Sequence, residues 1–290
     1  MGLVGTGTTP SLTPPMHMRE GREQGIALVY RPIDLTALDL EPERLPEILD
    51  WAERLGFDAL NITHPCKRDV IPLLGRLDPV AEGLGAVNTV LLTPEGRIGY
   101  NTDTTGFERA FREALPGAAT GSVVQLGAGG AGSAVSDALL RLGAADLVIV
   151  DLDAERAGAL AAELEVRHGR PVRAAGPEWL PELLETGDGV VNCTPIGMDH
   201  HPGTPLDPSL LRPRHWVADI VYRPLETELL RTAREVGCRT MHGGHMAVGQ
   251  AVDTFRLVTG READPARMHA HFRSLIEAED AAEAAETAAK

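Results

Sequence analysis

Short apolar runs separated by turn residues organise the first third of the chain. They predict strands at residues 3–5, 26–30, 57–62, 85–92 and 97–100, the last two joined by a hairpin turn at 94–96. Helices are expected at residues 16–22, 45–56 and 68–77. The helix at 45–56 has the clearest pattern, because its apolar residues recur at 45, 48, 49, 52 and 55 before Gly56. This alternation predicts an α/β domain.

From Gly121 onward the pattern changes to buried-type strands, each followed by a helix. Strands are predicted at 122–126, 147–150, 189–193, 216–221 and 239–241, and helices at 133–142, 154–164, 227–236, 246–257 and 265–276. The predicted fold class is α/β: an N-terminal α/β domain, then a second α/β domain of the Rossmann type, with the active site in the cleft between them. Residues 277–290, alanine-rich with five acids and one lysine, are expected to be a disordered acidic tail.

A glycine-rich turn lies between the strand at 122–126 and the helix at 133–142. It reads G-x-G-x-x-G, and an aspartate ends the next strand 19 residues after the last glycine. Such glycines let backbone N–H groups approach a pyrophosphate at a helix N-terminus, so this βαβ unit predicts dinucleotide binding. The residues expected at the cofactor are Gly127, Ala128, Gly129, Gly130, Ala131, Gly132, Asp151, Leu152, Arg156, Thr194 and Met198.

Asp151 also indicates which dinucleotide binds. A carboxylate at this position can accept hydrogen bonds from both ribose hydroxyls and repels a 2′-phosphate. Asp153 adds a second negative charge, and the nearest cation is Arg156, a turn into the next helix. NAD is therefore the expected cofactor and NADP the less favoured one. The nicotinamide end is expected near residues 194–198, after the strand at 189–193.

Lys67 is the residue that best predicts proton-transfer chemistry. The chain has 27 Lys plus Arg, yet its only lysines are Lys67 and Lys290. Arginine keeps its proton in proteins, whereas a lysine in a cleft can release one and take it back. Lys67 follows a predicted strand, and Asn88 and Asp103 flank strands that should pair with it in one sheet. Taken alone, Lys67 could be a surface lysine and Asp103 an Asx turn.

Ser11 and Thr13 place two hydroxyls in a loop before the predicted helix at 16–22. Hydroxyls at such a position can hold a carboxylate, but they can equally cap the helix. The residues alone leave both readings open.

Charge and composition exclude several classes of function. The net charge of −15, from 27 Lys plus Arg against 42 Asp plus Glu, argues against nucleic acid or an anionic membrane as a partner. No transmembrane run or signal peptide is recognisable. The three cysteines lie far apart without a C-x-x-C pair, which favours reduced thiols in a cytoplasm. His64, His242 and His245 lack the spacing of a ligand set, so no metal site is predicted.

Eight ordered motifs together resemble the shikimate dehydrogenase family over nearly the whole chain, to about residue 260. They are Ser11-x-Thr13-Pro14-x-Met16-His17, Asn61-x-Thr63-His64-Pro65-x-Lys67, Gly85-Ala86-Val87-Asn88-Thr89, Asn101-Thr102-Asp103, the glycine turn at 127–132, Asn192-x-Thr194-Pro195-x-Gly197-Met198, Tyr222-x-Pro224-x-x-Thr227 and Met246-x-x-x-Gln250. The resemblance implies a substrate domain at 1–104 completed by returning helices at 246–276, and an NAD-binding domain at 105–245.

The resemblance also implies a role for individual residues. Lys67 and Asp103 would be the catalytic pair, and Ser11 and Thr13 would hold the substrate carboxylate. The ring hydroxyls would contact Thr63, Asn88, Asp103 and Gln250, while Tyr222 would line the site.

Two departures narrow the expected activity. NADP-using members of the family typically carry Asn-Arg-Thr where this chain has Asp151-Leu152-Asp153, and biosynthetic members carry Ser-x-Ser-Pro where this chain has Thr13. Both features resemble the bacterial NAD-dependent quinate/shikimate dehydrogenases. The expected function is NAD-dependent oxidation of the C3 hydroxyl of shikimate or quinate, to 3-dehydroshikimate or 3-dehydroquinate, by a monomer or homodimer.

Two alternatives remain at this stage. One is an NADP-dependent biosynthetic shikimate dehydrogenase or an aminoshikimate-type relative. The other is an NAD-sensing module without turnover, which Lys67 and Asp103 disfavour because a sensor needs no proton relay.

Overall fold

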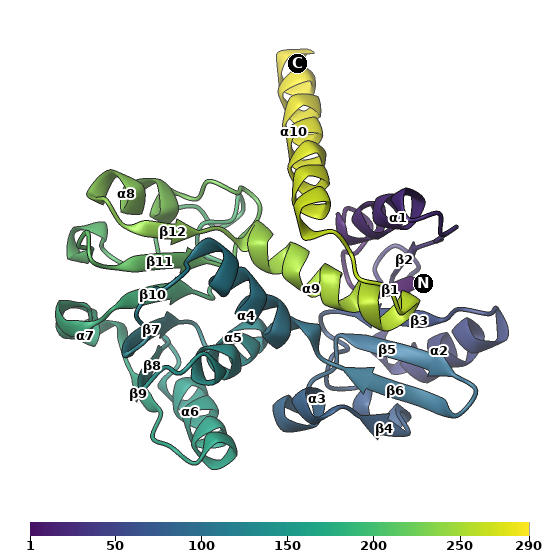
Figure 1. The fold of residues 1–290 in the computed structure, drawn as a ribbon, viewed down its shortest axis with the longest axis horizontal. Coiled ribbons are helices and arrows are strands. Elements are labelled where there is room, and N and C mark those ends of the chain that lie inside the picture. The colour runs from purple at the N-terminus through teal and green to yellow at the C-terminus, as the bar shows by residue number, and fades with distance from the viewer. Residues whose placement is uncertain (290) are drawn as a thin grey trace. The chain divides into compact units, whose positions relative to one another are not determined.

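The structure, a computed structural model, describes residues 1–289 and divides them into two compact units. The first unit contains residues 1–102 together with the segment from residue 250 to the C-terminus, and the second contains residues 103–249 (Figure 1). The predicted domain boundaries, at 104/105 and 245/246, fall a few residues from these. We describe each unit by itself.

A mixed six-stranded sheet forms the centre of the first unit. Its strands lie in the order β2-β1-β3-β5-β6-β4, with β1 parallel to both neighbours and β5 antiparallel to β3 and β6. The strand bounds are β1 (Gly2–Gly5), β2 (Arg31–Asp34), β3 (Ala59–Ile62), β4 (Arg76–Leu77), β5 (Thr89–Thr93) and β6 (Gly96–Tyr100). As predicted, the strand before Lys67 pairs with the strand that follows Asn88.

Alternating side chains on these strands bury both faces of the sheet. Val4, Leu60 and Val90 pack with α2 (Leu45–Arg54) on one face. Their neighbours Leu3 and Ala59 belong to a second cluster on the opposite face. That cluster also takes in side chains of α1 (Thr13–Glu23) and α9 (Gly243–Thr259). The period of two along each strand explains this division.

Three elements of the first unit differ from the sequence-based expectation. The predicted strand at 26–30 is irregular, and β2 begins only at Arg31. β2 contains Pro32, which cannot donate to a ladder, and its place at the edge of the sheet allows this residue. The predicted helix at 68–77 is instead a series of turns, a 3₁₀ turn over Ile71–Leu73 and the strand β4; Pro72 and Gly75 oppose a helix there. A short helix, α3 (Pro79–Leu84), follows.

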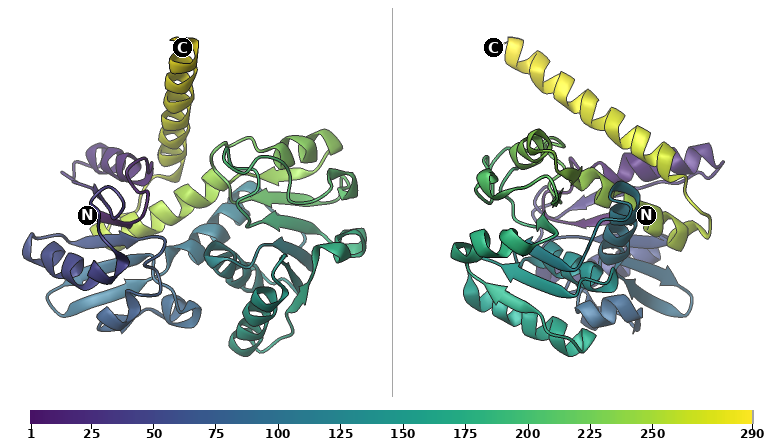
Figure 2. Two further views of the ribbon diagram at one scale, coloured as in Figure 1. Left: turned by 180° about the vertical axis from the view of Figure 1, so that it is seen from behind. Right: turned by 60° about the vertical axis from the view of Figure 1, so that its left-hand side comes forward.

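The expected disordered tail is helical in the structure. α10 runs from Pro265 to Ala289, beginning beside α1 and extending past the other elements of its unit (Figure 2). Alanine and glutamate are strong helix formers, and this propensity outweighs the low hydrophobicity of the segment. Lys290 lies outside the described residues.

The second unit is a doubly wound parallel sheet, as predicted. Its strands lie in the order β12-β11-β10-β7-β8-β9, and every pair is parallel. They are β7 (Ser122–Leu126), β8 (Asp146–Val150), β9 (Arg173–Ala175), β10 (Gly189–Asn192), β11 (Trp216–Asp219) and β12 (Arg239–Met241). The strand order reverses between β7 and β10, and in such sheets ligands bind at the carboxyl ends of the strands flanking that point.

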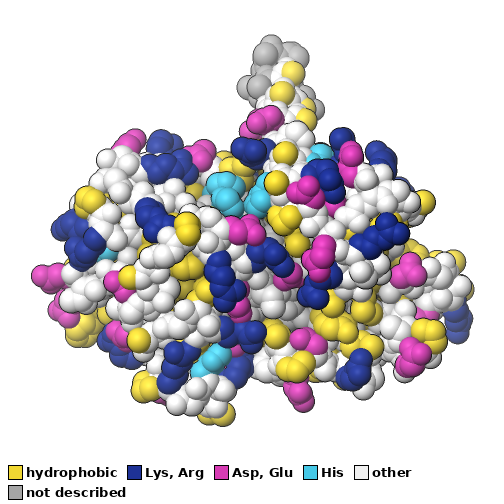
Figure 3. Space-filling view, in the orientation of Figure 1, with side chains coloured by type: hydrophobic (Ala, Val, Ile, Leu, Met, Phe, Trp, Pro, Cys, Tyr) yellow, Lys and Arg dark blue, Asp and Glu magenta, His cyan; other side chains and the backbone are white. Residues whose placement is uncertain are grey.

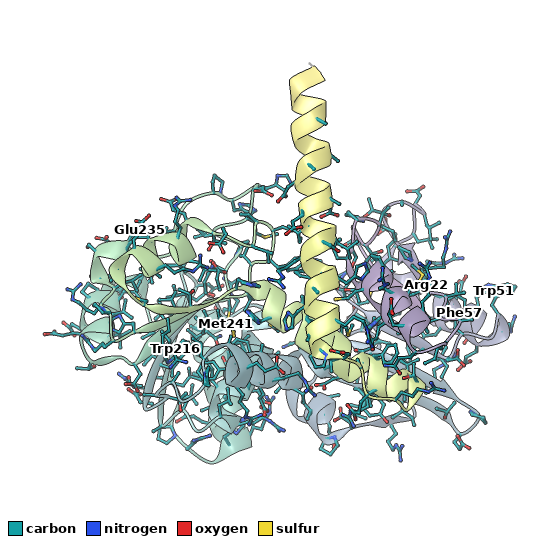
Figure 4. All side chains as sticks on the ribbon, turned by 45° about the horizontal axis from the view of Figure 1, so that its top comes forward. Arg22, Trp51, Phe57, Trp216, Glu235 and Met241 are labelled. Carbon is teal, nitrogen blue, oxygen red and sulfur yellow. The ribbon has the colours of Figure 1, made fainter. Side chains whose placement is uncertain are left out.

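Helices cover both faces of the second sheet. One face packs on α4 (Thr102–Ala114), α5 (Gly130–Arg141) and α6 (Ala154–His168), and the other on α7 (Leu180–Thr186) and α8 (Glu228–Val236). Trp216 and Met241, labelled in Figure 4, lie in the first of these two cores. Both faces of the four inner strands, β7, β8, β10 and β11, are thus buried, which is why these strands appear in the sequence as largely apolar runs.

Candidate active site

The polar motifs of the first unit meet at one edge of its sheet. Parallel pairing places Val4 of β1 opposite Ile62 of β3, so the loops that follow the two strands begin side by side. Thr6 N–H donates to the His64 carbonyl at 2.9 Å, and Thr63 N–H donates to the Val4 carbonyl at 2.9 Å. The loop that carries Ser11 and the segment that carries Lys67 therefore leave the sheet at the same edge.

Asn88 lies at this edge as well, because β5 runs antiparallel to β3. Ile62 N–H donates to the Asn88 carbonyl at 2.8 Å. The Asn88 side chain is buried; its Oδ1 accepts from Thr102 N–H at 2.9 Å, and its Nδ2 donates to the Thr102 hydroxyl at 2.9 Å. Nδ2 also lies 3.5 Å from Oε1 of Gln250. Of the predicted substrate-binding residues, the structure thus brings Asn88 and Gln250 together.

The loop that contains Ser11, which is predicted to bind the substrate carboxylate, is stabilised by hydrogen bonds within the first unit. Asp34, at the end of β2, accepts from Gly7 N–H at 2.9 Å, and from Thr9 N–H at 2.8 Å and its hydroxyl at 2.7 Å. These hydrogen bonds, the Thr9 hydroxyl first, hold the pKa of Asp34 at about 2. Ser11 Oγ accepts from Thr13 N–H at 3.3 Å. The Ser11 hydroxyl therefore serves the local turn, and its proton can still be donated to a ligand.

The remaining residues of the predicted substrate site divide between the units. Lys67 and Thr63 are half-buried in the first unit, and the Lys67 carbonyl accepts from Val87 N–H at 2.9 Å. Asp103 and Tyr222 belong to the second. Asp103 is buried in the first turn of α4, directly after Thr102, and Tyr222 is 36 % exposed in the loop after β11. The structure does not test the roles that the sequence assigned to these residues.

The glycine turn has the shape that a dinucleotide requires. A Cβ on Gly127, whose φ is +96°, would lie 2.9 Å from the Cys193 carbonyl oxygen, and one on Gly132 would lie 2.5 Å from the Gly127 carbonyl oxygen. By contrast, Gly129 and Gly130 face open space at the start of α5. The first N–H groups of a helix have no acceptor within the helix, so this opening is suited to a phosphate.

Six of the predicted cofactor residues line one pocket of about 430 Å³ in the second unit. They are Gly127, Gly129, Asp151, Leu152, Arg156 and Thr194. Ala128, Gly130, Ala131 and Gly132 adjoin it in the same turn, whereas Met198 is not part of its wall. Cys193, Pro195 and Ile196 complete the side formed by the loop after β10.

Asp151 and Arg156 form an ion pair in this pocket. Arg156 Nη2 lies 2.7 Å from Asp151 Oδ1, and Nε lies 3.3 Å from Oδ2. Asp151 also accepts from Ala128 N–H at 2.7 Å and Asp153 N–H at 2.9 Å. Burial opposes ionisation of Asp151, but the hydrogen bonds from Arg156, Asp153 and Ala128 outweigh it and lower the pKa. The carboxylate is therefore ionised at neutral pH and fixed to the glycine turn.

Two further observations concern other classes of site. Within residues 1–289, no three His, Cys, Asp or Glu side chains gather as metal ligands would. No helix in that range is long and apolar enough to span a membrane. On the face shown in Figure 3, acidic and basic side chains are interspersed on each unit.

Sequence and structural relatives share both units with this chain. Residues 3–90 match the family model of the shikimate dehydrogenase substrate-binding domain. The NADP-dependent shikimate dehydrogenase of Pseudarthrobacter chlorophenolicus is 56 % identical over 97 % of both chains. The chain belongs to the shikimate dehydrogenase family. Its fold also matches the quinate dehydrogenase of Corynebacterium glutamicum in complex with NAD, with a TM-score of 0.90 and 48 % identity over 94 % of this chain and 98 % of the other.

Relatives within the shikimate dehydrogenase family differ in the cofactor they are named for. The Pseudarthrobacter enzyme is named for NADP, whereas the quinate/shikimate dehydrogenase of Corynebacterium efficiens, 50 % identical over 95 % of this chain and 98 % of its own, is named for NAD. A nicotinamide dinucleotide is thus common to these relatives, and their names divide between NADP and NAD.

Sequence reasoning assigned no role to the buried residues that support the site. Tyr30 and Asn61 support Asn88 in the first unit, and Asp219 supports the loop after β10 in the second. Asn61 and Asp219 are polar residues within or at the end of apolar strands, which was a usable signal. Tyr30 gave no such signal, because a tyrosine in an apolar run is ordinary core composition.

Proposed function

We propose that this member of the family oxidises the C3 hydroxyl of shikimate, quinate or both, with NAD as the hydride acceptor. The observation that carries the choice of NAD is Asp151, an ionised carboxylate in the wall of the dinucleotide pocket. The substrate class is supported by the names of the relatives, which specify shikimate or quinate.

The glycine turn and Asp151 fit a nicotinamide dinucleotide. Gly127 and Gly132 leave no room for a side chain, and the start of α5 offers N–H groups to the pyrophosphate. When bound, the nicotinamide supplies the hydride acceptor. Asp151 accepts hydrogen bonds from ribose hydroxyls and repels a 2′-phosphate.

We assign the proton transfer to Lys67. Hydride removal from an alcohol carbon requires that its hydroxyl proton leave, and a half-buried lysine at the sheet edge can accept that proton and pass it to water. Following the family resemblance, Asp103 orients the lysine, and Asn88, Gln250 and Thr63 bind ring hydroxyls. Ser11 and Thr13 hold the carboxylate, and Tyr222 lines the site.

A second candidate, NADP as cofactor, is favoured by Arg156. Its side chain is 53 % exposed at the ribose end of the pocket and could turn from Asp151 to a 2′-phosphate. On our proposal the ion pair holds Arg156 in place, and the two acids, Asp151 and Asp153, dominate. The purified enzyme should then prefer NAD over NADP by more than about tenfold in kcat/KM, or ~1.4 kcal/mol.

The test measures NADH and NADPH formation with shikimate in the wild type and in Arg156→Ala. We expect NAD turnover to change little in the variant and NADP turnover to stay low in both. Equal kcat/KM values for the two cofactors in the wild type, with a selective loss of NADP turnover in Arg156→Ala, would establish the second candidate instead.

The role of Lys67 has its own test. Lys67→Ala should lose roughly 10²–10⁴-fold in kcat, as removal of a general acid–base does. Lys67→Arg should be nearly as impaired, because a guanidinium keeps its proton. Arg68→Ala removes the adjacent exposed cation and serves as the control, with near-normal kcat. A Lys67→Arg variant with wild-type kcat would leave Lys67 only a positioning charge.

Thr13 bears on the range of substrates. Quinate has a hydroxyl on C1, the carbon that carries the carboxylate, where shikimate has a ring double bond. Thr13 has the hydroxyl needed for the carboxylate but no second group dedicated to the C1 hydroxyl. Both acids should therefore be oxidised, with kcat/KM values within about a hundredfold, or ~2.7 kcal/mol, and Thr13→Ser should shift the ratio toward shikimate.

A further inference from the structure

Asp219 is a fully buried carboxylate at the end of β11, behind the loop that lines the cofactor pocket. Its Oδ1 accepts from the Asn192 side-chain amide at 3.0 Å and from Val221 N–H at 3.0 Å. Its Oδ2 accepts from the Thr227 hydroxyl at 2.8 Å. One side chain thus joins the end of β10, the loop after β11 and the start of α8.

Through Asn192, Asp219 determines the shape of the pocket loop. Asn192 Nδ2 donates to Asp219 and to the Ile196 carbonyl at 2.9 Å. Asn192 Oδ1 accepts from Thr194 N–H at 2.9 Å and from the Thr194 hydroxyl at 2.7 Å. The two ends of an amide have opposite hydrogen-bonding roles. Because an ionised carboxylate can only accept, Asp219 fixes which end of the Asn192 amide faces Thr194.

The same loop also packs directly against the Asp219 side of the network. A Cβ on Gly197 would lie 3.4 Å from the Thr227 methyl carbon and 3.7 Å from Asp219 Oδ2. Gly197 N–H donates to the His201 carbonyl at 2.7 Å, which closes the loop on itself. Thr194 and Ile196 of this loop line the cofactor pocket, so a shift of Asp219 or Asn192 would move the pocket wall.

Keeping a carboxylate at this position is unfavourable for the fold. Burial raises the pKa of Asp219 to about 6, although the hydrogen bonds from Val221, Thr227 and Asn192 act to lower it. The three donors are neutral groups, so they offset the lost hydration only in part. Such a cost is most readily explained by a function of the loop that the carboxylate holds.

We propose that Asp219 is a positioning residue for the cofactor: through Asn192 it holds residues 193–198 in the arrangement that receives the nicotinamide end. The inference rests on the proposed dinucleotide function and adds to it a residue that touches neither cofactor nor substrate. What matters is its hydrogen-bond geometry and not its charge.

A comparison of Asp219→Ala with Asp219→Asn tests this. The amide of the asparagine variant keeps an oxygen for Asn192 and Val221, and its nitrogen can donate to Thr227. Asp137→Ala is the control, because Asp137 is also buried in the same unit and accepts from Arg167 and His168, outside the residues that line the pocket. For each full-length variant one measures the Kd for NADH by fluorescence, the KM for NAD, kcat and the thermal midpoint.

We expect Asp219→Ala to raise the Kd for NADH and the KM for NAD about tenfold or more, and Asp219→Asn to remain within about threefold of wild type. Asp137→Ala should lower the thermal midpoint without changing either constant. The proposal is overturned if Asp219→Ala lowers only the midpoint, as the control does. It is equally overturned if Asp219→Asn is as impaired as Asp219→Ala, because charge would then matter instead of geometry.

Thr227 supplies a second pair of variants should Asp219→Ala not fold. Thr227→Ser keeps the hydroxyl that Asp219 accepts from, whereas Thr227→Val keeps the shape and loses it. Weaker NADH binding in Thr227→Val alone supports the proposal, and identical NADH binding in both refutes it. Failure of the proposed function is separately visible, since the wild type would then neither bind NADH nor reduce NAD with shikimate or quinate.

Discussion

Replacing Tyr30 with phenylalanine should weaken substrate binding, although Tyr30 has no assigned contact with the substrate. The Tyr30 side chain is buried, and its hydroxyl donates to Asn61 Oδ1. Asn61 Nδ2 donates in turn to the Thr89 hydroxyl at 2.8 Å, and that hydroxyl donates to Asn88 Oδ1 at 3.1 Å. Tyr30 therefore fixes the orientation of Asn61, and Asn61 fixes the direction in which Thr89 donates.

The magnitude follows from what Tyr30→Phe leaves behind. Asn61 Oδ1 is buried and would lose this donor, which costs about 1–3 kcal/mol of unfolding free energy. We take the share that reaches Asn88 as the net value of one hydrogen bond, about 0.5–1.5 kcal/mol. The KM for the acid should then rise roughly 2- to 12-fold. The kcat and the KM for NAD should stay near wild type, because the cofactor pocket lies in the other unit.

Urea unfolding and steady-state kinetics on the same preparation measure both effects. Tyr100→Phe is the control, because Tyr100 is a half-buried tyrosine of the same sheet. Its hydroxyl is outside this chain of hydrogen bonds. An unchanged unfolding free energy would mean that Asn61 finds another donor. A lower free energy with an unchanged KM would show that the network stabilises the fold without positioning Asn88. Either result refutes the reasoning.

Three further predictions concern single positions. His17 is fully buried between Tyr30 and Phe255, and burial lowers its pKa to about 3. The unfolded chain therefore binds the extra proton first, and the free energy of unfolding should fall as pH drops from about 6.5 toward 3, by up to roughly 4–5 kcal/mol. In His17→Phe, the free energy of unfolding measured in urea should depend less on pH across this range. Gly132→Ala should abolish NADH binding, measured by fluorescence, because its Cβ would lie 2.5 Å from the Gly127 carbonyl oxygen. Arg267→Met should lower the unfolding free energy by about 3 kcal/mol, because it leaves the buried Glu20 carboxylate without its cation, and Glu20→Gln in the same chain should recover part of that loss.

The sequence was most informative where a pattern is local. The glycine turn of the second unit could be predicted because strand, turn, helix and acid follow one another within about thirty residues, as the βαβ unit requires. The pairing of the strand before Lys67 with the strand after Asn88 was also correct, and so was the hairpin that joins the latter to the next strand.

The sequence-based assignments were wrong where contacts with a distant segment of the same chain determine the local structure. β2 contains Pro32, and only its place at the sheet edge makes that residue acceptable. The apolar residues of the segment at 68–77 had helical spacing, yet Pro72 and Gly75 break it and β4 pairs with β6 instead. Two of the partners of Glu20, Asp264 and Arg267, could not be read from the sequence, because they lie more than 240 residues away.

Each unit has a buried asparagine whose side-chain amide is hydrogen-bonded at both ends. The two residues, Asn88 and Asn192, lie at the end of a strand. In each, the amide oxygen accepts a hydrogen bond and the amide nitrogen donates one. Each asparagine is in turn oriented by a buried group to which we assign no ligand contact. In the first unit this group is Tyr30, which acts through Asn61, and in the second it is Asp219, which accepts from Asn192 directly. An amide with both ends occupied cannot flip without breaking several buried hydrogen bonds, so the loop it holds is fixed before any ligand arrives. On our proposals, binding then needs no free energy to order these segments, and Tyr30 and Asp219 act on affinity without contacting a ligand.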